Sequence, residues 1–134
     1  MTRLLAGFAI AALLAPSLLL AHHSFAAEFD STKTVTVNGA VTKVEWTNPH
    51  IWIYVDQKDA TSAAVAKWQC EMGSPNSLMR LGWRSDSLKQ GDQVTIEGTR
   101  AKDGSNTCNA RTVRLADGRR MFAGSSEGTA PARP

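Results

Sequence analysis

Two runs of β-branched and aromatic residues, joined by a short polar segment, constrain what this chain can fold into. Residues 41–55 read VTKVEWTNPHIWIYV, and the central tetrapeptide Thr47-Asn48-Pro49-His50 has the composition of a turn. Around that turn, apolar residues alternate with their neighbours at the period of a β-strand. The sequence therefore predicts a strand, a turn and a second strand near the middle of the chain.

The N-terminus has the pattern of an export signal. The chain begins Met-Thr-Arg and then continues from Leu4 to Ala21 without a charged residue. A short cationic segment followed by an apolar run is typical of a secretory signal peptide. We expect residues 1–21 to be removed after Ala21, which makes the mature protein periplasmic or secreted. A cut after Ala26 is the alternative, and an uncleaved leader would tether the protein to a membrane.

Charge argues against a nucleic-acid partner. Removing Arg3 from the 15 basic residues leaves 14 against 12 acidic residues, a net charge of +2. The longest basic run is Arg119-Arg120, so no basic patch is available to follow a phosphate backbone. We therefore expect no nucleic-acid partner.

The remaining pattern predicts short strands and one helix. A first strand is expected from near Thr34, and its alternation slips phase between Val41 and Val44, as a β-bulge does. Ser74-Pro75 is a helix start signal and Gly82 a stop signal. The other expected elements are strands at residues 51–56, 65–72, 93–100 and 108–115, a helix at 76–81 and a short segment at 119–123.

This element order predicts an all-β domain with one short helix. Three strands, a helix and two more strands is the order of an OB-fold, a five-stranded Greek-key barrel. We expect a small five- to six-stranded OB-fold-like barrel at residues 34–123, after an N-terminal arm at residues 22–33. Residues 124–134 contain little that a fold can bury, so we expect a disordered tail.

Five short motifs stand out along the expected mature chain. They are HHSF after the leader, VEWTNPH, EMGSPN, LKQGDQVTIEG and RAKDGSN. Together they resemble a family of short bacterial exported proteins whose function is unknown, over roughly His22 to Gly124. The resemblance implies export and a single domain, and it transfers no catalytic residue.

The chain has two cysteines, Cys70 and Cys108. In an oxidising compartment, an even pair is most simply one disulfide. Two buried thiols or two soft metal ligands are the alternatives, although the spacing does not resemble a metal knuckle. We expect the Cys70–Cys108 disulfide.

The three histidines, His22, His23 and His50, suggest a metal site. Cleavage after Ala21 would let the α-amino group and imidazole of His22 chelate one ion. A third imidazole nitrogen would complete a T-shaped site suited to Cu(II). This arrangement resembles the histidine brace of exported copper proteins and copper oxygenases. His50 is the preferred third ligand and His23 the alternative, because adjacent residues chelate with poor geometry. In the competing interpretation, His50 only closes its turn.

A second hypothesis rests on aromatic residues and needs no metal. OB-folds bind oligomers across the second and third strands with aromatic side chains. The candidates for an oligosaccharide, peptide or protein partner are Trp46, Trp52, Tyr54 and Trp68. The competing interpretation is ordinary cross-strand packing of these rings.

We predict a protein without enzymatic activity. The sequence contains no Gly-rich phosphate loop and no CxxC or HExxH motif. The carboxylates of Asp56, Asp59, Glu71 and Glu97 are scattered along the chain, and we expect all four to be solvated.

Overall fold

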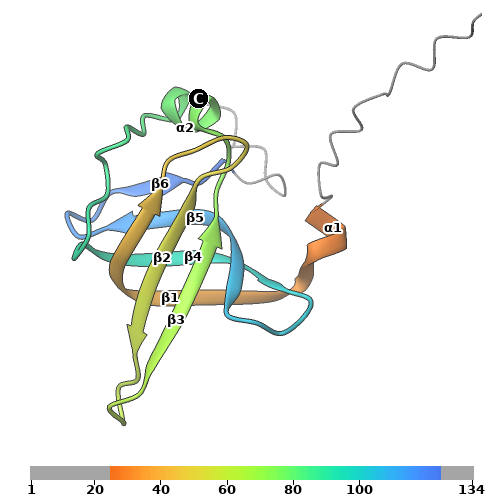
Figure 1. Cartoon of the computed structure of the whole chain (residues 1–134), viewed down its shortest axis with the longest axis vertical. Coiled ribbons are helices and arrows are strands. Elements are labelled where there is room, and N and C mark those ends of the chain that lie inside the picture. The colour runs from red at the N-terminus through yellow and green to blue at the C-terminus, as the bar shows by residue number, and fades with distance from the viewer. Residues whose placement is uncertain (1–24, 125–134) are drawn as a thin grey trace, which may run out of the picture.

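A computed structural model of the protein describes residues 25–124, which form six strands and two short helices (Figure 1). The expected signal peptide, His22, His23 and residues 125–134 lie outside this range. No helix in the described range is long and apolar enough to cross a membrane. In chain order the elements are α1 (Phe25–Glu28), β1 (Phe29–Glu45), β2 (Trp52–Lys58), β3 (Val65–Glu71), α2 (Pro75–Arg80), β4 (Gln93–Ala101), β5 (Thr107–Leu115) and β6 (Arg120–Phe122).

The six strands form one sheet that closes on itself like a ring (Figure 1). β1 pairs antiparallel with both β2 and β4, β2 pairs with β3, and β4 pairs with β5. A parallel contact between β3 and β5 completes the ring, and β6 lies outside it on β5. The predicted all-β class is confirmed, and the strands connect in the order expected of an OB-like fold.

The long strand β1 serves both halves of the ring. Its first part pairs with β4 as far as Ala40, and the strand then continues along β2. The register shifts between Val41 and Lys43, which is the predicted bulge. Gly39 lies where the two halves meet, and a Cβ there would be 2.2 Å from the carbonyl oxygen of Asp56. Only glycine therefore allows β1 to pass this close to β2.

The predicted start of the first strand near Thr34 is wrong. The strand begins at Phe29, so part of the predicted arm belongs to the sheet. Between Phe29 and Thr34 the register against β4 shifts, and the side chains of residues 31–34 are exposed. An irregular, exposed strand segment has no period-2 pattern for sequence reasoning to find.

Helix α2 lies at one end of the ring (Figure 1). The helix contributes Leu78 to the core, and the segment that follows it contributes Trp83. The Ser74 side chain caps it by accepting from the Ser77 N–H at 3.3 Å, as the sequence predicts. Beyond its C-terminal end, Gly82 adopts a φ of 96°. Leu78 and Trp83 are buried, and Trp83 Nε1 donates to the Phe122 carbonyl oxygen at 2.7 Å.

The apolar core fills the inside of the ring. Its members alternate along the strands with outward-facing polar residues, as a half-buried sheet requires. The largest fully buried apolar side chains are Val37, Val41, Ile51, Ile53, Val55, Met72, Leu78, Trp83, Ile96 and Val113.

The contact that closes the ring is short and covalently reinforced. β3 and β5 are matched over three residue pairs, with Cys70 opposite Cys108 in the middle. The two cysteines form a disulfide, their Cα atoms are 4.5 Å apart, and both are fully buried. The predicted disulfide is confirmed.

Breaking the disulfide should destabilise the protein. It closes a chain segment of 38 residues, for which the chain-entropy model gives about 4 kcal/mol. We expect the Cys70→Ala/Cys108→Ala variant to lose about that much free energy of unfolding in urea titrations. A reductant should lower the urea midpoint of the wild type and leave that of the variant unchanged. An unchanged urea midpoint of the reduced wild type, with its two free thiols verified by intact mass, would contradict this account.

Candidate functional site

The turn between β1 and β2 places His50 beside the end of β3. The Asn48–Pro49 peptide bond in this turn is cis. Ile51 then extends the β2–β3 pairing, because its N–H donates to Gly73 O at 3.0 Å and its carbonyl accepts from Met72 N–H at 2.8 Å. His50, one residue earlier, lies on the opposite face of the sheet from the buried Ile51.

On that outer face His50 meets a buried carboxylate. His50 Nδ1 is hydrogen-bonded to Glu71 Oε1, and Asn109 Nδ2 donates to Glu71 Oε2 at 3.4 Å. Glu71 is 8% exposed and Asn109 is 4% exposed, whereas the His50 side chain is 36% exposed. The three side chains therefore form a polar row that runs from the protein interior to the surface.

The carboxylate determines which ring nitrogen of His50 is available. An ionised carboxylate only accepts hydrogen bonds, so Nδ1 carries a proton in this contact. In the neutral ring Nε2 then has the lone pair. Among the described residues, Nε2 has no hydrogen-bond partner. His50 thus presents an oriented nitrogen that can take a proton or a metal ion.

The prediction that Glu71 is solvated is wrong. Pairing of β3 with β5 places Glu71 opposite Asn109, and β4 places Thr99 next to Asn109. Both neighbours are buried, although all three residues face outward from the apolar core. One signal in the sequence could have predicted this contact. Glu71 directly follows Cys70, and Asn109 directly follows Cys108. A disulfide between two parallel strands therefore places Glu71 and Asn109 side by side.

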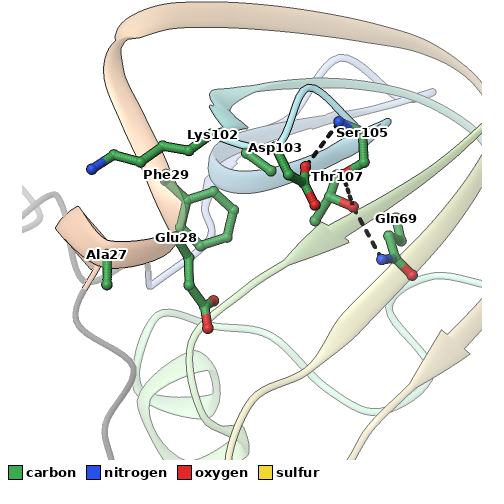
Figure 2. A pocket seen from close by; sticks show the side chains of 9 residues that line it. Ala27, Glu28, Phe29, Gln69, Lys102, Asp103, Ser105 and Thr107 are labelled. Atoms are coloured by element: carbon green, nitrogen blue, oxygen red, sulfur yellow. Dashed lines mark hydrogen bonds between the residues drawn. The ribbon is translucent and has the colours of Figure 1, made fainter.

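The N-terminal segment covers the same face of the ring. A hollow of about 390 Å³ lies between this segment and the sheet. Figure 2 shows its lining, with Glu28 and Phe29 on one side and Gln69 and Thr107 on the other. Lys102 holds the segment there, because its backbone N–H donates to Glu28 O at 2.8 Å. Gln69 and Glu71 share one face of β3, so the chain enters the fold on the face that carries His50.

The polar groups of this hollow satisfy one another. Gln69 Nε2 donates to Thr107 Oγ1 at 3.0 Å, and the Ser105 N–H donates to Asp103 Oδ1 at 2.9 Å (Figure 2). Ala27 and Glu28 of α1 also line the hollow, so it lies between α1 and the sheet.

Two of the four predicted aromatic residues share the outer face with His50. Trp52 and Tyr54 are both half-buried. The Lys43 ammonium lies 5.3 Å from the centre of the Tyr54 ring, and the Tyr54 hydroxyl donates to Glu45 at 3.0 Å. Burial and this hydrogen bond raise the pKa of Tyr54, whereas hydrogen bonds from Lys43 and Tyr54 lower the pKa of Glu45. Lys43 thus covers part of the surface that a stacking ligand would need.

The other two aromatic residues lie elsewhere. Trp46 and Trp68 both pack against the core. Trp68 is opposite Val55 in the β2–β3 register, so it faces away from Trp52 and Tyr54. The arrangement divides the four predicted residues between two faces of the sheet. Trp68 lines a pocket, which it shares with Arg100.

Comparison with known proteins identifies the family. A family model described as a family of unknown function, DUF6152, matches residues 10–110. The chain belongs to the DUF6152 family. This confirms the expected membership of a family of unknown function. No curated protein and no solved structure matches the chain.

The His50–Glu71 contact in this DUF6152 protein predicts a tautomer. At alkaline pH, where imidazole rings are neutral, we expect long-range ¹⁵N–¹H spectra to show His50 protonated at Nδ1. Glu71→Ala should remove that preference because the acceptor is lost, whereas Glu45→Ala on β1 should leave it intact. A wild-type His50 protonated at Nε2 would contradict the arrangement.

Proposed function

We propose that the protein is exported and binds one Cu(II) ion through His50. His50 Nε2 supplies one ligand, and His22 supplies its imidazole and α-amino nitrogens once the leader is cut after Ala21. The observation that carries the proposal is the hydrogen bond between His50 Nδ1 and the buried Glu71 carboxylate.

A carboxylate behind a histidine is the usual support of a metal ligand. Metal-binding histidines commonly donate their second ring N–H to a carboxylate, which fixes the ring and increases its basicity. Glu71 stands in that position and is itself held by Asn109 at 3.4 Å. A histidine that merely closed its turn would need only a backbone partner.

The other ligands must come from outside the described range. Within residues 25–124, no three His, Cys, Asp or Glu side chains lie close enough to hold a metal ion. His22 and His23 are the histidines beyond it. The three residue steps from His22 to Phe25 span at most about 10 Å, and α1 lies on the face of the ring that carries Glu71. This shared face supports His22 as the partner of His50, with His23 as the alternative.

Export is supported by two separate features. The uncharged run from Leu4 to Ala21 follows a cationic start, as signal peptides do. The Cys70–Cys108 disulfide is of a kind that persists in oxidising compartments. Imidazole and amine nitrogens suit Cu(II) better than the soft Cu(I) ion, which agrees with such a compartment.

Cleavage can be tested without any metal. We expect N-terminal sequencing of the protein, expressed with its own leader and recovered from a periplasm, to begin at His22. A mature start at Ala27 would remove both early histidines and end the copper proposal.

Copper binding can be tested on that mature protein. We expect calorimetry to give one Cu(II) per chain and EPR to show nitrogen ligands. His50→Ala should weaken binding by at least tenfold, and Glu71→Gln by about tenfold, because outer-shell changes typically cost about 10–100-fold in affinity. Glu97→Gln, a carboxylate change on β4, is the matched control and should bind as the wild type does.

The double variant His22→Ala/His50→Ala gives the sharpest contrary result. If it folds with an unchanged circular dichroism spectrum and still binds Cu(II) as the wild type does, the His50–Glu71 pair has only a structural role.

A further inference from the structure

A second candidate site lies on the opposite face of β3 from His50. The β2–β3 hairpin projects beyond the ring (Figure 1), and between this hairpin and the β4–β5 loop is a pocket of about 510 Å³. Its size falls within the range of ligand-binding pockets, roughly 300–1,000 Å³. The lining residues used below are Lys58, Asp59, Ala66, Trp68, Arg100 and Asn106.

Arg100 is held in a fixed position in this pocket. Its Nε donates to Ser105 O at 3.1 Å, and its Nη2 donates to Gly104 O at 2.7 Å and to Asn106 Oδ1 at 3.2 Å. The guanidinium carbon lies 5.5 Å from the centre of the Trp68 ring. Nη1 remains without a hydrogen-bond partner in the described part of the chain. A guanidinium fixed in this way is preorganised to donate to a carboxylate.

The charge of the pocket favours an anion. Lys58 and Arg100 are its two cations, and Asp59 is its one carboxylate among the described residues. Oδ1 of Asp59 already accepts hydrogen bonds from the N–H and hydroxyl of Thr61 and from Ser62 N–H. Asp59 therefore shapes the hairpin loop, and the net charge around the pocket is positive.

Next to the pocket, β3 has an open edge. Gln69 N–H donates to Asn106 O at 3.0 Å, away from β2. Because backbone groups two residues apart point the same way, those of Val65 and Lys67 also point away from β2. β5 pairs with β3 only from Gln69 to Glu71, and within residues 25–124 no other strand pairs with residues 65–67 on that side. Val65 is 45% exposed.

We propose that this edge and pocket bind an extended acidic peptide. The peptide adds to the sheet as a strand along residues 65–67, and its backbone hydrogen-bonds to that edge. Alternate side chains of such a strand point to the face of Ala66 and Trp68, where a peptide carboxylate accepts from Arg100 Nη1.

An oligosaccharide fits these observations less well than a peptide. A sugar would stack on a ring face, and one face of Trp68 is covered by Arg100. Binding of a sugar would make no use of the open edge of β3 beside the pocket. An added peptide strand would use both that edge and the Arg100 guanidinium.

The test is an NMR titration of the ¹⁵N-labelled mature protein with the blocked pentapeptide TVEVT. We expect the Val65 and Lys67 amides and the Arg100 Nε–H to shift, with a Kd of about 1 mM or tighter, as suits a short strand without other contacts. The peptide TVQVT, which lacks the carboxylate, should bind at least about tenfold more weakly. This comparison leaves the protein unchanged, so it avoids the effect that Arg100→Gln would have on the loop.

Two variants at one position test the edge. Lys67→Pro removes the edge N–H and should weaken TVEVT binding at least about tenfold, whereas Lys67→Ala keeps the N–H and should bind within about threefold of the wild type. Three outcomes would each overturn the proposal. The first is equal binding of TVEVT and TVQVT, and the second is the absence of shifts up to about 10 mM peptide. The third is a shift of the Val65 and Lys67 amides and the Arg100 Nε–H with oligogalacturonate but not with TVEVT. His50→Ala should bind the peptide normally, so this result does not depend on copper.

Discussion

The short parallel contact between β3 and β5 is the constraint on which the rest of the structure depends. It converts an open sheet into a ring over three residue pairs, with the Cys70–Cys108 disulfide at its centre. Because side chains alternate along a strand, the disulfide points into the core while the pairs on either side point outward. Those outward pairs are Gln69 with Thr107, which line the hollow beside α1, and Glu71 with Asn109, which support His50.

This closure also explains how a carboxylate comes to be buried on the outside of the ring. Burying an ionised group without partners is costly, and such groups are tolerated when they are paired and hydrogen-bonded. Glu71 has His50 on one oxygen and Asn109 on the other, and no buried side-chain nitrogen or oxygen in the described range lacks a partner. A network of this kind orients an imidazole more firmly than a turn alone would.

β3 therefore has two faces with different chemistry. One face carries Glu71, which contacts the turn histidine proposed to bind copper, and the other carries Trp68 and the pocket with Arg100. The peptide proposal uses the free end of the strand, and the copper proposal uses the end where the ring closes. The two proposals rest on separate residues, so each can fail without affecting the other.

The sequence by itself determined the local structure. The alternation of residues 41–55, the phase slip that became the bulge after Val41, and the Ser74 cap each depend on a few neighbouring residues. Periodicity and turn chemistry report such local features directly. Even the disulfide could be predicted without geometry, from the expected oxidising compartment and the presence of two cysteines.

Only the tertiary structure decided what the polar residues do. Glu71 and Asn109 are 38 positions apart and meet because β3 and β5 pair. Trp68 and Arg100 likewise meet across the ring, although sequence reasoning grouped Trp68 with rings on the other face. Burial and hydrogen bonding depend on contacts between distant strands, which the pattern of any single strand does not encode.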